Sequence, residues 1–124
     1  MQLTRHRNEN QLFVRHADAA SVRVIDREYR NSILLDATRL DDAFAPRRVE
    51  DLDDAAIARI LALQPDVVLL GTGARAIFPQ PRVLAAFLSR GVGLETMDNA
   101  AVARTFNVLV GEGRNVAAVF LFPD

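Results

Sequence analysis

A continuous apolar run, Val67-Val68-Leu69-Leu70, is followed at once by a glycine turn, Gly71-Thr72-Gly73. Such a run predicts a strand that is buried on both faces, which is typical of a parallel sheet covered by helices. Glycine has no Cβ, so the backbone can turn tightly here or approach a ligand closely. The two features together predict an α/β fold and a candidate binding site over residues 71–76. A tight turn that needs no ligand is the alternative interpretation of the glycines.

The second half of the chain alternates predicted helices and strands. Helical spacing of apolar residues predicts a helix near 57–61, with Asp53 or Asp54 at its N-terminus. A second helix is expected to begin at Pro81, because proline suits the first helical turn. Its expected core face carries Val83, Leu84, Phe87 and Leu88.

Strands are predicted over residues 94–97 and 116–122, with a third helix between them. Asp98 or Asn99 can cap that helix. Its expected core side carries Val102, Phe106 and Leu109, while Arg104 and Asn107 lie on the opposite side. Arg104 and Asn107 are therefore the expected partner-binding residues, although Arg104 can equally pair with Glu112 on the surface.

The first half reads as β structure. Short alternating patterns at 13–14 and 22–25 and the apolar run at 33–35 predict strands, with a hairpin over residues 21–37. Residues 39–54 are acidic and are expected to form a loop. The carboxylates at the end of this segment are better explained by the following helix N-terminus than by a metal ion.

Composition excludes several functional classes. The formal net charge is −1, from 15 basic and 16 acidic residues, which argues against a nucleic-acid partner. The chain has no cysteine, so thiol catalysis and iron–sulfur ligation are excluded. His6 and His16 lie ten residues apart in a polar stretch, and we expect no metal and no cofactor. The 124 residues suit one domain spanning 1–124.

No apolar segment approaches the roughly 20 residues that a membrane-crossing helix needs. The N-terminal stretch also has no hydrophobic signal core. We therefore expect a cytoplasmic location and no direct insertion into a membrane.

If strands 67–70 and 94–97 are parallel neighbours, their carboxyl ends share the edge where α/β sheets bind ligands. The expected ligand-binding set is Gly71, Thr72, Gly73, Arg75, Glu95, Thr96 and Asp98. Backbone amides at the glycine turn, aided by an arginine, favour a small anion. The two carboxylates could also serve as acid and base, but no histidine, cysteine or serine nucleophile accompanies them, so catalytic residues stay unassigned.

The spacing Gly71-Xaa-Gly73-Xaa-Xaa-Ala76, with Glu95 downstream, also satisfies the dinucleotide-binding fingerprint. That fingerprint requires a helix running directly from the glycine turn. Pro79 and Pro81 interrupt the region where this helix would lie, which argues against a nucleotide site.

Three stretches carry a family resemblance: residues 65–73, residues 93–98, and the pair 103–109 and 111–118. Together they resemble the Mth-type domain family of unknown function, which includes mitochondrial complex I assembly factor three and adipogenesis-associated Mth-domain proteins. The resemblance implies a three-layer α/β fold, in which helices flank a central mixed sheet and the N-terminal half adds a β layer. No enzymatic activity is attached to the family.

The sequence thus predicts a noncatalytic binding or assembly protein. The family resemblance implies that its protein partner belongs to the assembly of a respiratory complex, complex I. The alternative is an enzyme, or a protein that binds a small molecule or anion in the cleft between 71–73 and 95–98.

Overall fold

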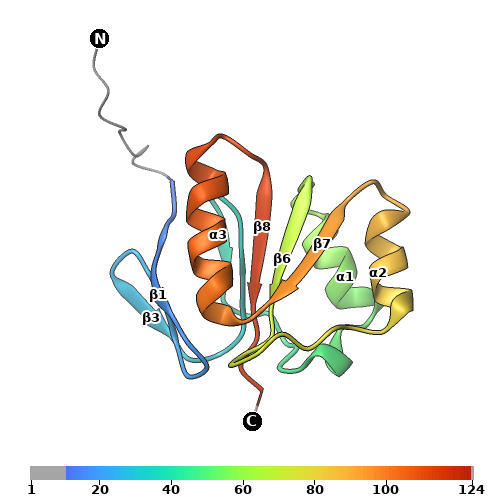
Figure 1. Cartoon of the computed structure of the whole chain (residues 1–124), viewed down its shortest axis with the longest axis horizontal. Helices are drawn as coiled ribbons and strands as arrows, with labels where there is room; N and C mark the ends of the chain where they lie inside the picture. Colours follow the sequence, from blue (N-terminus) through green and yellow to red (C-terminus); the bar gives the residue numbers. More distant parts are fainter. Residues whose placement is uncertain (1–10, 124) are drawn as a thin grey trace.

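The computed structural model describes residues 11–123 (Figure 1). Its centre is a five-stranded sheet in the order β5-β4-β8-β6-β7. The parallel strands are β6 (Val67–Gly71), β7 (Gly93–Met97) and β8 (Val116–Phe120), and two antiparallel strands, β4 (Ile33–Leu35) and β5 (Leu40–Asp41), complete it. The predicted α/β class with a mixed central sheet is confirmed.

Helices cover both faces of this sheet, as Figure 1 shows. Helix α3 (Asn99–Gly111) packs on one face, and α1 (Asp54–Leu61) with α2 (Pro81–Leu88) packs on the other. Strand β6 therefore turns Leu69 toward α3 and Val68 and Leu70 toward α1 and α2, and all three are at most 1% exposed. Burial on both faces is the physical reason for its unbroken apolar run.

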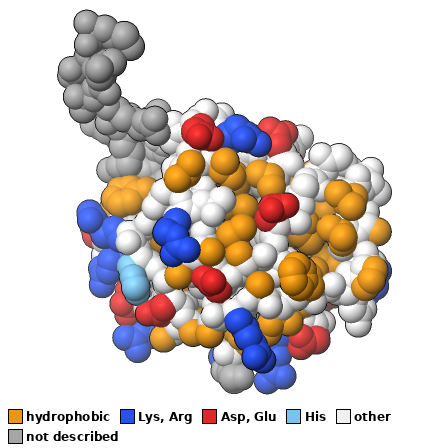
Figure 2. All heavy atoms as spheres, in the orientation of Figure 1, with side chains coloured by type: hydrophobic (Ala, Val, Ile, Leu, Met, Phe, Trp, Pro, Cys, Tyr) orange, Lys and Arg blue, Asp and Glu red, His pale blue; other side chains and the backbone are white. Residues whose placement is uncertain are grey.

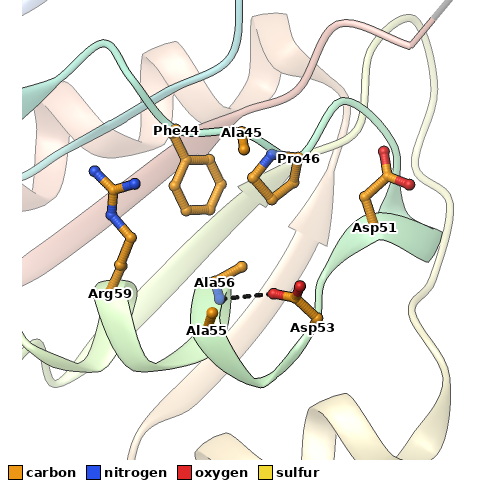
Figure 3. A pocket seen from close by; sticks show the side chains of 8 residues that line it. All are labelled: Phe44, Ala45, Pro46, Asp51, Asp53, Ala55, Ala56 and Arg59. Carbon is orange, nitrogen blue, oxygen red and sulfur yellow. Dashed lines mark hydrogen bonds between the residues drawn. The ribbon is translucent and has the colours of Figure 1, made fainter.

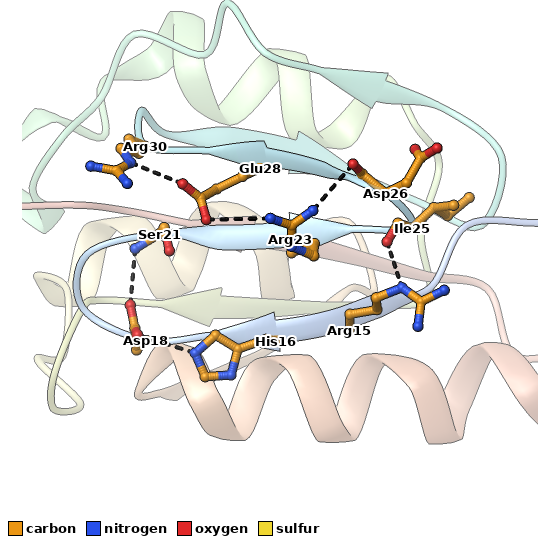
Figure 4. Close-up of polar contacts among 9 residues, drawn as sticks. All are labelled: Arg15, His16, Asp18, Ser21, Arg23, Ile25, Asp26, Glu28 and Arg30. Carbon is orange, nitrogen blue, oxygen red and sulfur yellow. Dashed lines mark hydrogen bonds and ion pairs between the residues drawn. The ribbon is translucent and has the colours of Figure 1, made fainter.

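The N-terminal half adds a separate antiparallel sheet beside α3. Its strands are β1 (Val14–Ala17), β2 (Val22–Val24) and β3 (Arg27–Tyr29). The turn between β2 and β3 contains Ile25 in the left-handed region, with φ 55°. Polar side chains line the outer surface of this sheet, where Glu28 lies between Arg23 and Arg30 (Figure 4).

The structure corrects the predicted hairpin over residues 21–37. The hairpin pairs β2 with β3, so it is shorter, and β4 instead pairs with β5 and β8 in the central sheet. The reason is burial: all three residues of β4 are at most 2% exposed, which requires a sheet covered on both faces.

The acidic segment 39–54 is largely a loop, as expected, although it contains β5 and a short 3-10 helix, η1 (Val49–Asp51). Asp53 caps α1, and its carboxylate accepts a hydrogen bond from the Ala56 N–H at 2.9 Å. The capping interpretation of this acidic run is therefore confirmed.

Helix α2 begins at Pro81, as predicted, but its core face is narrower than expected. Val83 and Phe87 are buried, whereas Leu84 and Leu88 are 40% and 57% exposed. The helix lies at the edge of the sheet over β7, so only one stripe of it can reach the core. Predicting Leu84 and Leu88 as core residues was wrong.

Candidate functional site

The glycine turn at the end of β6 is closed by the protein itself. A Cβ on Gly71 would lie 2.4 Å from Asn99 Oδ1 and 3.0 Å from the Val119 carbonyl oxygen. Gly73 has φ +103°, a conformation that side-chain-bearing residues rarely adopt. Glycine is thus needed at both positions for reasons internal to the fold.

The side chain of Asn99 lies against the glycine turn and is hydrogen-bonded to it. Its side chain is fully buried, and its Oδ1 accepts a hydrogen bond from the Gly73 N–H at 3.1 Å. Its Nδ2 donates to the carbonyl oxygens of Asp18 at 3.1 Å and Leu121 at 3.0 Å. One amide side chain therefore joins the end of β6, the segment after β8 and the turn between β1 and β2.

The polar groups of Thr72 are also engaged within the fold. Its N–H donates to the Met97 carbonyl at 3.2 Å, and its hydroxyl donates to the Arg75 carbonyl at 2.5 Å. The same hydroxyl accepts from the Ile77 N–H at 2.9 Å. The two amides expected to hold an anion, those of Thr72 and Gly73, are therefore already hydrogen-bonded inside the protein.

The two sequence clusters do meet, but their side chains diverge. The Thr72–Met97 bond and a bond from the Asn99 N–H to the Gly73 carbonyl bring the two turns together. Glu95 is exposed on β7, and its neighbour Thr96 points to the opposite face because side chains alternate along a strand. The cavity that Thr72 lines, about 240 Å³, lies against Arg48, Ile77 and Pro123 rather than against β7.

The remaining two predicted ligand residues are Asp98, which caps a helix, and Arg75, which lies in an exposed loop. The Asp98 carboxylate caps α3 by accepting from the Ala101 N–H at 2.8 Å. Arg75 is exposed in the loop after the turn. No helix leaves the glycine turn, since α2 begins only at Pro81, and this agrees with the argument against a dinucleotide site.

Asn107 was predicted to face outward, as a partner-binding residue, and the structure corrects this orientation: its side chain points toward β1. Its Oδ1 accepts from the Val14 N–H at 2.8 Å and its Nδ2 donates to the Val14 carbonyl at 2.7 Å. The side chain completes the hydrogen bonding of β1, so it holds the N-terminal sheet against α3.

Arg104 is exposed, as predicted, and lies in a groove between β1 and α3. The groove measures about 290 Å³, and Arg15 and His16 also line it. Next to it, the Ala20 N–H, the His16 ring and the Ser21 N–H all bond to the Asp18 carboxylate and hold its pKa below the usual range (Figure 4). The groove therefore carries two arginines and one histidine.

A further cavity, of about 390 Å³, lies between α1 and the loop before η1 (Figure 3). Phe44 and Pro46 form one wall, and Asp53 and Arg59 lie on the other. Its polar groups are engaged: Asp53 caps α1, and Arg59 bonds to Asp41 and to the Ala43 carbonyl. The cavity therefore offers little unpaired polarity for holding a ligand.

Within residues 11–123, no three histidine or acidic side chains are grouped so that they could hold a metal ion. His16 is exposed beside Asp18 at 3.1 Å, and His6 lies outside the described residues. No helix in the same range is long and apolar enough to cross a membrane.

The match to a family model decides the family. Residues 14–121, nearly the whole described chain, match the family described as protein of unknown function (DUF498/DUF598). The chain belongs to this family. A Xanthomonas campestris protein solved by NMR is 40% identical to this chain, and the two structures superpose with a TM-score of 0.85. The match covers 98% of this chain and 92% of the Xanthomonas campestris chain.

A Bordetella pertussis structure described as a Mth938-like domain shares the fold, with a TM-score of 0.80 at 24% identity over 100% of this chain and 94% of that one. The resemblance to Mth-type domains is therefore confirmed.

Among curated relatives, the Francisella tularensis "13 kDa major membrane protein" is 26% identical over 76% of this chain and 77% of that protein. The Bos taurus "NADH dehydrogenase [ubiquinone] 1 alpha subcomplex assembly factor 3" is 34% identical over 60% of this chain. The match spans only 41% of that assembly factor's length.

The sequence analysis did not predict that the Asn99 side chain joins three segments, those of Gly73, Asp18 and Leu121. We call this meeting point the Asn99 junction. The sequence nevertheless carries a signal for the burial of Asn99. It stands three, seven and eleven residues before Val102, Phe106 and Val110, which are all buried. A polar residue on the buried stripe of a helix must find hydrogen-bond partners inside. With Asp98 available as the cap, Asn99 is free to turn inward.

Replacing Gly73 with valine should destabilise this DUF498/DUF598 domain by about 1 to 3 kcal/mol, because valine cannot adopt φ +103° without strain. Its Cβ would also press on Pro123, 3.1 Å away. Urea unfolding measures the change, with Ala74→Val on the exposed neighbouring residue as the control. Equal stabilities of the two variants would contradict the strained backbone.

Proposed function

We propose that the chain is a noncatalytic assembly protein that docks on a partner protein through the exposed apolar surface of α2 and the loop before it. This α2 surface consists of Ile77, Phe78, Leu84 and Leu88. The observation that carries the proposal is the exposure of Phe78, which is 76%.

Helix α2 is apolar on its outward side as well as its inward side. Leu84 and Leu88 stand one turn apart, and Pro81 and Ala85 beside them are exposed. A helix that is hydrophobic all round is normally covered, so its bare side favours a partner. Figure 2 shows hydrophobic side chains gathered on the side of the molecule where α2 lies in Figure 1.

The chain segment that carries the α2 surface has charges of one sign. Residues 67–94 contain three arginines, Arg75, Arg82 and Arg90, and no acidic residue. All three arginines are exposed. The complementary partner presents an apolar patch with an acidic rim, because opposite charges around an apolar contact raise specificity and the rate of association.

The noncatalytic part of the proposal is supported by how the glycine-turn groups are used. The Thr72 hydroxyl, the Asp98 carboxylate and the Asn99 amide are each hydrogen-bonded within the fold. The link to respiratory complex I rests on the name of the mitochondrial relatives, which are assembly factors for NADH dehydrogenase.

In a strain lacking this gene, a copy carrying Phe78→Ser and Leu88→Ser should fail to restore complex I, seen on native gels as free subunits in place of the assembled enzyme. Both side chains are exposed, so their loss should change the free energy of unfolding by about 0.5 kcal/mol or less each. Val108→Ser is the matched control, since Val108 is 56% exposed on α3 and Leu88 is 57% exposed. Normal assembly of complex I in the deletion strain would contradict the respiratory role. Full rescue by the double variant would contradict docking through the α2 surface.

The basic groove beside Arg104 is a second candidate docking surface, favoured by its three cationic or titratable side chains, Arg15, His16 and Arg104. Arg104→Glu reverses the charge at its centre without touching the core, and it should lower partner affinity roughly tenfold or more if the groove is the interface. The same rescue assay separates the two surfaces. Loss with Arg104→Glu alone assigns docking to the groove, and loss with the double serine variant alone assigns it to α2.

A further inference from the structure

A small cavity, partly open to solvent, lies at the start of β4, on the far side of β8 from the glycine turn. Its volume is about 150 Å³, which corresponds to roughly five water molecules at about 30 Å³ each. Ser32, the residue before β4, lines it together with Phe44 and Phe122. A space of this size suits a compact ligand of a few heavy atoms.

Among residues 11–123, the hydroxyl of Ser32 has no hydrogen-bond partner. The residue is only 3% exposed, and its Oγ is buried. A buried hydroxyl without a partner costs free energy, so native structures rarely keep one without a reason. A ligand that accepts a hydrogen bond in the cavity would supply that reason.

The charged side chains that line the cavity are two arginines, Arg30 and Arg47. Arg30 Nε also donates to the Glu28 carboxylate at 3.0 Å, which offsets part of this positive charge. Asn31, also part of the lining, is held in place by donating to the Asp42 carbonyl at 2.7 Å. Arginine recognises carboxylate and phosphate groups through paired N–H donors.

The cavity also lies at the edge of the sheet where ligands are expected. Ile33 pairs with Phe120, and Gly71 pairs with Phe120 on its other side. Ser32 is therefore at the carboxyl ends of β6 and β8, the edge where α/β sheets bind ligands.

We propose that this cavity binds a small oxyanion, a phosphate or carboxylate group, which accepts a hydrogen bond from the Ser32 hydroxyl and lies between the Arg30 and Arg47 guanidinium groups. The site is independent of the α2 surface and of the glycine turn. It assigns the anion to residues different from those that the sequence indicated.

The test is a titration of the full chain with inorganic phosphate, acetate and glycerol 3-phosphate, followed through amide NMR shifts with sodium chloride at matched ionic strength as the blank. Saturable shifts are expected at residues 30–32 and 44–47. Binding of acetate or phosphate but not of glycerol 3-phosphate identifies a free anion, whereas binding of glycerol 3-phosphate identifies a group on a larger molecule. Shifts that do not saturate with any probe, or that centre on residues 71–76, overturn the proposal.

Two variants and a control complete the test. Ser32→Ala and Arg47→Gln should each weaken binding about tenfold, since each removes a hydrogen bond to a charged group. Arg114→Gln, an exposed arginine outside the cavity, should bind as the wild type does. Unchanged affinity of Ser32→Ala, or a fall of several degrees in its Tm without ligand, would show that the hydroxyl does not serve the anion and would overturn the assignment.

Discussion

Replacing Asn99 with alanine should lower the free energy of unfolding by about 3 to 5 kcal/mol, a large fraction of the stability of an ordinary domain. The substitution leaves three backbone groups without partners: the Gly73 N–H and the carbonyls of Asp18 and Leu121. Asn99 is fully buried, so water cannot replace the lost hydrogen bonds without opening the junction.

Urea unfolding followed by circular dichroism measures this change. Asn115→Ala is the matched control, because Asn115 is exposed and its Nδ2 makes one bond, to the Gln64 carbonyl. We expect the control to lose less than about 1 kcal/mol. A loss at Asn99 no larger than at Asn115 would show that Asn99 does not hold the three segments together.

Replacing Gly71 with alanine should cost about 3 kcal/mol, which is large for one added methyl group. The new Cβ would meet Asn99 Oδ1 at 2.4 Å, and Asn99 cannot withdraw because it is held by its own hydrogen bonds. Val119 and Val102 close the other sides at 3.0 and 3.1 Å. The φ of Gly71 is not positive, so the cost comes from these close contacts, chiefly the one with Asn99, rather than from backbone strain.

Gly93→Ala is the control for the added methyl group. Gly93 begins β7, and a Cβ there would meet Val67 at 3.6 Å, an ordinary contact. The double variant Gly71→Ala with Asn99→Ala should be less destabilised than the sum of the single variants, because removing the amide also removes the clash. Additive losses, or equal losses at Gly71 and Gly93, would contradict the contact between Gly71 and Asn99.

The regular elements of the second half were predictable because their signals are local. The run before Gly71 is apolar on both faces, and Pro81 marks the first turn of α2. The tight glycine turn was also predictable, since it needs only the absence of a Cβ.

Features that depend on tertiary contacts were not predictable from the same patterns. Helical spacing predicted Leu84 and Leu88 to be core residues. Because α2 lies at the edge of the sheet, these two side chains are exposed instead. Strand β4 reads as the continuation of a hairpin, yet it pairs with β8, which is about 85 residues away in the sequence. No local pattern specifies a pairing of this range.

The location expected for a site could be derived from the sequence, but the free polar groups there could not. The carboxyl edge of the parallel strands follows from the order of elements, and both the glycine turn and the Ser32 cavity lie there. Which polar groups remain unpaired at that edge depends on the fold. Asn99 accepts a hydrogen bond from the Gly73 amide, whereas no residue in the described range bonds to the Ser32 hydroxyl.

Site-specific photo-crosslinking in living cells tests docking through α2 most directly. A photoreactive amino acid in place of Leu88 or Phe78 should form an adduct of one defined mass, and the same group in place of Val108 should not, although Val108 and Leu88 are equally exposed. Charge reversal at Arg82, on the rim of the α2 surface, should weaken the adduct at position 88. An adduct at position 108 as strong as the one at 88, or none at 88 and 78, would contradict the account.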